Sequence, residues 1–139
     1  MTYYAVIDTN VLVSALLSSH EDAATVQVVG KLFSGDVIPI FNKEILNEYN
    51  QVLRRKKFHF SENTICTLLR VIEKYGELVT PSPTGEILPD IKDLPFYEVV
   101  MEKQEDGAYL VTGNMKHFPD RSFIVTAKEF LNIINQNHQ

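Results

Sequence analysis

Short apolar runs alternate with amphipathic segments along most of the chain. The run at residues 3–7 is nearly continuous in apolar, β-forming residues, as expected for a strand buried on both faces, and it ends abruptly at Asp8. Further strands are predicted at residues 37–41, 78–79, 108–112 and 123–125. Strands that alternate with helices indicate an α/β fold in three layers, with a mainly parallel five-stranded sheet between helices.

Helical periodicity fills the intervals between the predicted strands. A first helix follows the polar turn after Asp8, and a second is expected to begin at the capping-box spacing of residues 19–22 and to end at Gly35. Its predicted buried face carries Val26, Val29, Leu32 and Phe33. The tail at residues 135–139 is expected to fray.

The later helices have clearer start signals. Asn42 and Ser61 are predicted N-caps, and residues 126–129 form a capping box for the last helix. The helix after Asn42 is expected to end in the basic run at residues 54–57. Pro39 predicts irregular or short pairing of the second strand, and the Pro-rich stretch at residues 81–89 is the one long loop.

Length and composition limit the class of protein. The chain has 139 residues, 45% of them hydrophobic and 22% charged, which predicts a single domain over residues 1–139 with a packed core. No apolar stretch approaches the ~20 residues that a membrane-spanning helix needs. Because no basic segment precedes the first apolar run, a secretory signal does not fit, and we expect the protein to stay in the cytoplasm.

The formal net charge of −5 argues against general electrostatic binding of nucleic acid. It does not exclude a nuclease, because carboxylates that bind divalent cations reverse their local charge. The single cysteine, Cys66, excludes an internal disulfide and a multi-cysteine zinc site, and we expect it to be a small buried hydrophobe. The histidines show no metal-ligand spacing and are expected at the surface: His20, His59, His117 and His138.

Acidic residues are the remaining candidates for chemistry, because the phosphate-binding glycine motifs and the G-x-S-x-G nucleophile motif are absent. Asp8 ends the first strand and is either a site residue or an N-cap. Glu48 lies roughly 90° from the centre of the apolar helix stripe, whereas Glu44 lies roughly 130° away, so Glu48 borders the core and Glu44 faces water. Hard oxygen ligands of this kind suit Mg²⁺ or Mn²⁺.

The second half of the chain adds candidates of the same kind. Asp93 precedes a helix and is either a site residue or its cap, and Asp90 is expected to close the Pro-rich loop. Asn114 follows the fourth strand in a polar turn at the strand end. The basic run 54–57, with the aromatic segment 58–60 after it, could contact phosphates and bases or could simply be solvated.

Four motifs in this order resemble the PIN domain family, and more narrowly the toxin components of bacterial toxin–antitoxin pairs. They are Val6-Ile7-Asp8-Thr9-Asn10-Val11, Glu44-Ile45-Leu46-Asn47-Glu48-Tyr49, Asp90-Ile91-Lys92-Asp93-Leu94-Pro95-Phe96, and Leu110-Val111-Thr112-Gly113-Asn114 followed by His117-Phe118-Pro119. The resemblance extends over nearly the whole chain, to Val125–Leu131.

The resemblance implies strand order 3-2-1-4-5 and a metal-dependent endoribonuclease that hydrolyses RNA phosphodiester bonds. Asp8, Glu48 and Asp93 match the family's acids, whereas Asn114 stands where the family often has Asp, so one negative charge is missing. The implied ligands of Mg²⁺ or Mn²⁺ are Asp8, Glu48, Asp93 and Asn114. The resemblance also implies RNA and a small antitoxin protein as partners, and a homodimer as the oligomeric state.

Two other functions compete with the nuclease. The first is an RNA-binding or scaffolding module with weak or no nuclease activity, which the missing charge at Asn114 favours. A phosphatase of the haloacid dehalogenase type needs a second Asp two residues after Asp8, and Asn10 occupies that position.

Overall fold

The computed structural model describes residues 2–137 and contains five strands in those residues. The strands are β1 (Tyr3–Ile7), β2 (Val37–Phe41), β3 (Glu77–Leu78), β4 (Tyr109–Val111) and β5 (Ile124–Val125). All neighbours pair in parallel, in the order β3-β2-β1-β4-β5. The predicted parallel α/β sheet and its strand order are therefore confirmed.

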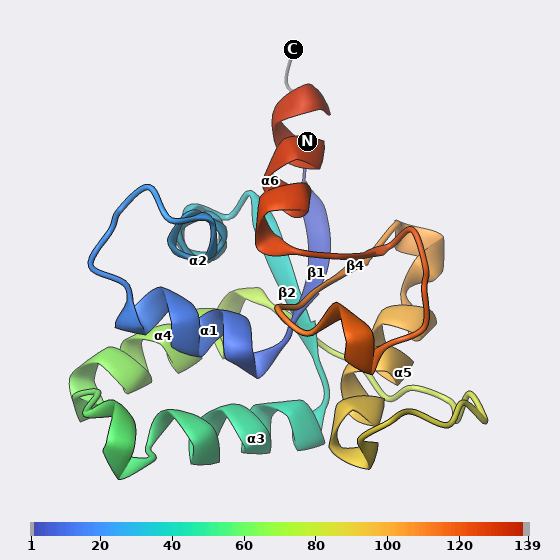
Figure 1. Cartoon of the computed structure of the whole chain (residues 1–139), viewed down its shortest axis with the longest axis horizontal. Coiled ribbons are helices and arrows are strands. Elements are labelled where there is room, and N and C mark those ends of the chain that lie inside the picture. Colours follow the sequence, from blue (N-terminus) through green and yellow to red (C-terminus); the bar gives the residue numbers. More distant parts are fainter. Residues whose placement is uncertain (1, 138–139) are drawn as a thin grey trace.

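Helices cover both faces of this sheet. They are α1 (Thr9–Leu17), α2 (Ala24–Ser34), α3 (Lys43–Leu53), α4 (Glu62–Tyr75), α5 (Leu94–Glu102) and α6 (Ala127–Asn137). Figure 1 shows α2 and α4 on one side of β1 and β2, and α5 on the other. Helix α5 contacts β1, β2 and β4, whereas α2 contacts β2 and α6, and α6 contacts β4 and β5. Short 3-10 turns add η1 (Lys56–Phe58), η2 (Ile91–Asp93), η3 (Gln104–Asp106) and η4 (Met115–His117).

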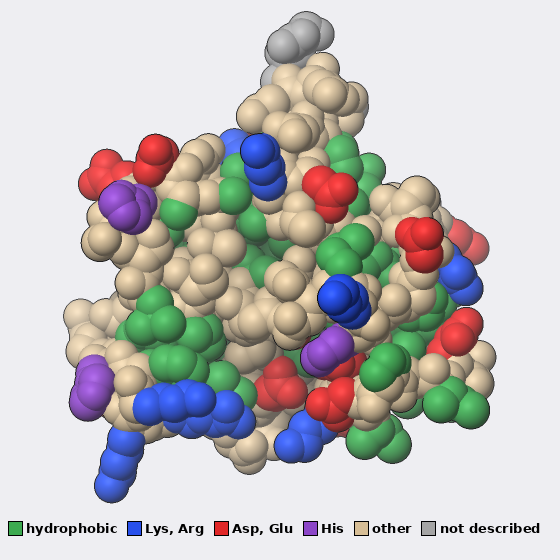
Figure 2. All heavy atoms as spheres, viewed as in Figure 1, with side chains coloured by type: hydrophobic (Ala, Val, Ile, Leu, Met, Phe, Trp, Pro, Cys, Tyr) green, Lys and Arg blue, Asp and Glu red, His purple; other side chains and the backbone are tan. Residues whose placement is uncertain are grey.

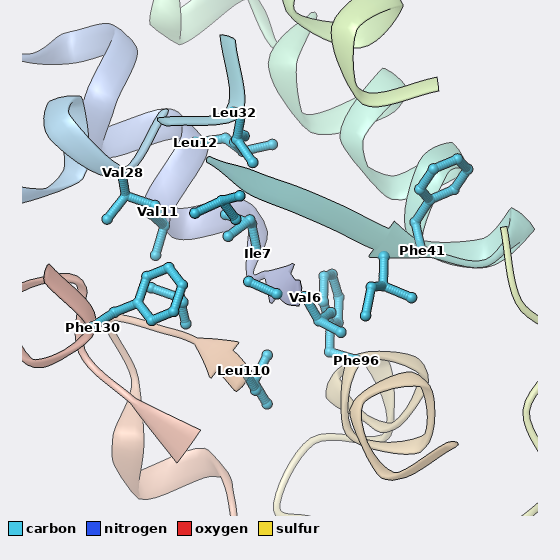
Figure 3. Close-up of a cluster of buried hydrophobic side chains, with 14 of the residues drawn as sticks. Val6, Ile7, Val11, Leu12, Val28, Leu32, Phe41, Phe96, Leu110 and Phe130 are labelled. Carbon is cyan, nitrogen blue, oxygen red and sulfur yellow. The ribbon is translucent and has the colours of Figure 1, made fainter. Parts of the chain in front are cut away.

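Strand β1 lies at the centre of the core, which explains its nearly continuous apolar sequence. Val6 and Ile7 are at most 1% exposed and lie among side chains from helices on both faces. Figure 3 shows Phe96 of α5 and Phe130 of α6 approaching this strand from different sides, with Leu110 of β4 between them. The central strand thus holds the residue that follows it, Asp8, in a fixed position.

The start of α2 differs from the sequence prediction. Residues 21–22 form a turn, and the helix begins at Ala24 with Ala23 as N-cap, without a side-chain cap. The polar groups around residue 20 are used locally instead, because the His20 N–H donates to Ser18 Oγ and Gln27 Nε2 donates to the Asp22 carbonyl. The buried face carries Val28, Val29 and Leu32, while Phe33 is 49% exposed.

The other helix starts follow their cap signals. Asn42 accepts a hydrogen bond from Ile45 N, Ser61 accepts one from Thr64 N, and Thr126 and Glu129 form the reciprocal capping box. Helix α3 ends at Leu53, so the basic run lies in the following turn and not in the helix. At the other end of the chain, α6 is helical to Asn137, beyond the predicted start of fraying, and His138 lies outside the described residues.

A close approach of two backbones fixes the edge of the sheet beside Pro39. Strand β3 pairs only with Ile40 and Phe41, so it starts beyond the proline and is short, as the missing N–H predicts. Gly76, between α4 and β3, lies close to the backbone of Ile72 and Pro39. A Cβ added to it would be 2.4 Å from the Ile72 carbonyl oxygen and 2.5 Å from the Pro39 carbonyl oxygen. Only glycine fits between these two carbonyls.

Candidate active site

A cavity of about 630 Å³ lies beside the carboxyl end of β1, where residues of α1, α3 and η2 meet. Ligands of parallel sheets bind at such carboxyl ends. Figure 2 shows acidic side chains gathered near the lower edge of this face, beside an apolar area over α1 and basic side chains next to α3. The charged residues of the cavity wall are Asp8, Glu48, Asp90, Asp93, Arg55 and Lys92.

Asp8 is held by residues from its own turn and from β4. The pairing of Ile7 with Val111 places Thr112 beside Asp8, and Asp8 N donates to the Val111 carbonyl at 2.9 Å. Asp8 Oδ2 accepts hydrogen bonds from Thr112 Oγ1 at 2.7 Å and from Asn10 Nδ2 at 3.2 Å. Although Asp8 occupies the N-cap position of α1, its side chain makes no cap hydrogen bond within the described chain. The carboxylate is therefore directed by the sheet and not by a capping role.

Glu48 reaches the same cavity from α3. Burial of Ile45 and Tyr49 sets the rotation of this helix, and the Tyr49 hydroxyl donates to the Ile7 carbonyl directly before Asp8. Glu48 accepts a hydrogen bond from the Thr9 hydroxyl. Glu44, one turn earlier, is exposed and lies outside this cavity wall, as the helix geometry predicted.

Asp93 comes to the cavity from the turn before α5. Its side chain makes no cap hydrogen bond, and its Oδ2 lies 3.0 Å from His117 Nδ1 in η4. His117 was expected at the surface, and its ring is half-exposed but also hydrogen-bonded to Asp93, a contact that the sequence did not predict. Asp90 has the predicted turn role, because its Oδ1 accepts a hydrogen bond from Lys92 N at 2.9 Å.

Asn114 is the predicted site residue that lies apart from the other three. It is exposed, and it does not belong to the wall of the cavity that Asp8, Glu48 and Asp93 share. Its backbone N–H donates to Thr112 Oγ1 at 2.9 Å, so the same hydroxyl joins Asn114 to Asp8. The structure therefore brings three of the four predicted residues into one cavity and leaves the fourth at its margin.

Three of the four carboxylates that line the cavity, those of Asp8, Glu48 and Asp93, have a raised pKa. Burial is the largest cause for each, and it raises the pKa of Asp8 from 3.8 to about 6. The nearby charges of Asp93 and Glu48 raise the pKa of Asp8 further, while the Thr112 hydrogen bond lowers it. Burial also raises the pKa of Glu48 and of Asp93, and the His117 hydrogen bond partly offsets the shift of Asp93. Burial, more than repulsion between the carboxylates, therefore raises these pKa values.

Such a set of donors fits a hard divalent cation by its chemistry. Carboxylate oxygens are the ligands that Mg²⁺ and Mn²⁺ prefer, and a bound cation would remove the mutual repulsion. Across residues 2–137, however, no three His, Cys, Asp or Glu side chains already form a group that could hold a metal ion. The three carboxylates share a cavity without being gathered around one point.

Several polar residues of the site were missed as site residues by the sequence analysis. Thr9 and Thr112 orient Glu48 and Asp8, and Asn10 joins the two strand ends by accepting from Gly113 N at 3.0 Å. The available signal was that Thr9 and Asn10 follow Asp8 directly and that Thr112 precedes Gly113. His117 had no comparable signal except its place in the last motif.

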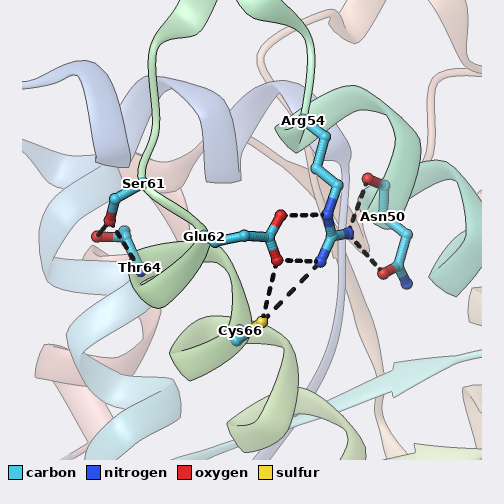
Figure 4. Close-up of polar contacts among 6 residues, drawn as sticks. All are labelled: Asn50, Arg54, Ser61, Glu62, Thr64 and Cys66. Carbon is cyan, nitrogen blue, oxygen red and sulfur yellow. Dashed lines mark hydrogen bonds and ion pairs between the residues drawn. The ribbon is translucent and has the colours of Figure 1, made fainter.

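The basic segment after α3 contains two adjacent arginines in different roles. Arg54 forms a bidentate ion pair with Glu62, at 2.6 and 2.9 Å, and also donates to Asn50, as Figure 4 shows. Cys66 is half-buried and donates to Glu62 Oε2 at 3.3 Å, so the prediction of a buried hydrophobe is wrong because this ion pair offers the thiol a polar partner. Arg55 instead lines the cavity.

Comparison with known proteins agrees with this geometry. A family profile described as the PIN domain matches residues 4–116, and the chain belongs to this family. No curated protein and no solved structure matches the chain significantly. PIN domains have a nuclease-type fold, are generally metal-dependent nucleases and usually bind divalent metals. No helix within residues 2–137 is long and apolar enough to span a membrane.

The raised pKa of Asp8 predicts how stability depends on pH in the absence of metal. Because the folded state binds this proton more tightly than the unfolded chain, the free energy of unfolding falls as pH rises from about 4 to about 6. Asp8→Asn removes this dependence on pH. The free energy of unfolding of the variant should therefore exceed that of the wild type by an amount that grows from near zero below pH 4 to about 2–3 kcal/mol above pH 6.5. Urea denaturation in EDTA at several pH values measures this difference. A difference that does not change with pH would contradict the prediction.

Proposed function

We propose that this protein is a Mg²⁺- or Mn²⁺-dependent endoribonuclease that hydrolyses RNA phosphodiester bonds. The main support is the meeting of Asp8, Glu48 and Asp93 in one cavity at the carboxyl end of β1, with burial holding the pKa of Asp8 at about 6. Buried carboxylates that repel one another are costly unless a cation joins them.

In this proposal Asp8, Glu48 and Asp93 hold the cation, with Asn114 as a neutral oxygen donor at the margin. When bound, the cation supplies activation of water and stabilisation of the charge on the phosphate. The hydrogen bonds from Thr112, Thr9 and His117 keep the three carboxylates oriented, since each carboxylate receives one of them.

The biological setting is part of the same proposal. The resemblance to toxin components supports a toxin that a small antitoxin neutralises. In this proposal the toxin acts in the cytoplasm as a homodimer, and each chain is a single domain. The alternative is a PIN-fold RNA-binding or scaffolding module with little activity. It is favoured by Asn114 at the position of a missing acid and by the three carboxylates not being gathered around one point.

Substitution on α3 tests the nuclease against the module. Purified protein should cleave a labelled RNA with Mg²⁺ or Mn²⁺ but not in EDTA, and Glu48→Gln should reduce kcat/KM by about 100-fold because a charged ligand is lost. Glu44→Gln is the matched control, one turn away on the same helix and exposed, and should leave cleavage unchanged. RNA binding without cleavage in the wild type would favour the module. Equal effects of the two variants would remove Glu48 from the site.

A further inference from the structure

The cavity that contains the carboxylates has a second, chemically different end. Its apolar wall consists of Val13 and Leu17 from α1, Val52 from α3 and Phe58 from η1. Leu17 is 56% exposed, which is unusual for a leucine unless it faces a ligand or a partner. The apolar wall continues directly from the acidic wall, since Val52 lies one helical turn, about 6 Å along the axis, beyond Glu48.

Phe58 is held in place within this wall. Its ring stacks on Phe60 with the centroids 5.5 Å apart and the planes 14° apart. The residue between them, His59, has a φ of 57°, the left-handed conformation, and is the only non-glycine residue with positive φ in the described chain. This turn brings the two rings together, and a ring fixed in this way loses little entropy when it binds a flat ligand.

The charges on this wall suit an anion attached to that ligand. Arg55 and Lys92 line the cavity, and neither forms an ion pair with a carboxylate in the part of the chain that is described. Both lie near enough to Glu48 to lower its pKa. Arg54, by contrast, is already bound to Glu62. Arg55 is therefore the arginine available for a phosphate.

We propose that the apolar end of the cavity is a nucleobase subsite, which binds one unpaired base next to the cleaved RNA phosphodiester while Arg55 and Lys92 contact the adjacent phosphates. This inference rests on the proposed ribonuclease function. A volume of about 630 Å³ is in the range of sites for small ligands and admits a nucleotide. A base inside a duplex cannot enter, so the substrate is single-stranded at this position.

Two pairs of matched variants test the subsite through cleavage. Phe58→Ala should lower kcat/KM for a labelled single-stranded RNA about tenfold or more, mainly by raising KM, because base–aromatic contact is lost. Arg55→Gln should raise KM and reduce the salt dependence of binding. Phe33→Ala and Arg54→Gln are the controls, since Phe33 is exposed on α2 and Arg54 is paired, both outside the cavity. Both controls should behave like wild type.

An abasic residue in the RNA shows whether Phe58 binds a base. After the cleavage position has been mapped, an abasic nucleotide beside it should slow the wild type about tenfold and leave Phe58→Ala unaffected. Equal slowing of both proteins, or of neither, would overturn the proposal. Unchanged RNA cleavage in Phe58→Ala would do the same, and would leave the apolar wall for a protein partner.

A binding measurement separates this proposal from the nuclease function. Fluorescence anisotropy with a labelled 12-nucleotide RNA compares Asp8→Asn with Asp8→Asn/Phe58→Ala, and the second protein should bind about tenfold more weakly. If the wild type cleaves nothing but this difference is found, the subsite stands and the nuclease fails. If the wild type cleaves RNA but Asp8→Asn and Asp8→Asn/Phe58→Ala bind it equally, the subsite fails. It also fails if the wild type cleaves RNA but Asp8→Asn does not bind it.

Discussion

Asp8→Asn is expected to abolish metal-dependent RNA cleavage, lowering kcat/KM at least about 100-fold, and to remove the rise in Tm that Mn²⁺ gives the wild type. Asp8 is 5% exposed and is the most buried of the carboxylates that line the cavity. Asparagine has the same shape and can still accept the hydrogen bond from Thr112, so the fold is kept while the charge is lost. RNA cleavage and thermal melts with millimolar Mn²⁺ or EDTA measure both effects.

The control for this experiment is Asp22→Asn, which changes an exposed aspartate outside the cavity. It alters the net charge by the same amount and should leave both the cleavage and the Tm shift unchanged. An equal Tm shift in wild type and Asp8→Asn would show that Asp8 does not bind the metal. Full cleavage by Asp8→Asn would place the chemistry at other residues.

Gly76→Ala is expected to lower the free energy of unfolding by about 3 kcal/mol or more, a fall in Tm of about 10 °C. A methyl group at this position would overlap the carbonyl oxygens of Ile72 and Pro39, and both belong to regular elements that cannot move aside. The space between them is too narrow for any side chain. Urea denaturation and thermal melts of the purified variant measure the loss.

Gly30→Ala is the matched control for Gly76→Ala. Gly30 lies within α2, and nothing lies within 4 Å of the position that its Cβ would take. Alanine there should stabilise the protein by about 0.5–1 kcal/mol through its helix propensity. Stabilisation by both substitutions would show that the contact at Gly76 is not as close as described.

The sequence predicted the sheet and the place of the acidic residues because both depend on local patterns. A continuous apolar run ending at Asp8 indicates a buried strand followed by a strand-end carboxylate, and the phase of α3 distinguishes Glu48 from Glu44. The start of α2 could not be found in this way, because residues 19–22 have capping-box spacing but form no cap, and the hydrogen bonds around them are made by Ser18 and by the Asp22 main-chain carbonyl.

Contacts between distant residues account for the other differences. The hydrogen bond of Thr112 to Asp8 follows from the pairing of β1 with β4, and that of His117 to Asp93 joins two turns 24 residues apart. No local spacing encodes either contact. Cys66 differs for another reason, because its partner Glu62 lies one turn earlier on α4 and is a local contact that helical spacing allows.

The pairing of β1 with β4 also determines when the carboxylate cavity can form during protein synthesis. Asp8 and the Thr112 that orients it are 104 residues apart, and β4 is a direct neighbour of β1 in the sheet. While the ribosome is still making the middle of the chain, only one of the two strands that flank β1, namely β2, has been synthesised, and neither Asp93 nor Thr112 exists. The nascent chain therefore carries Asp8 and Glu48 without the residues that complete their surroundings, and the site is assembled among the last parts of the fold.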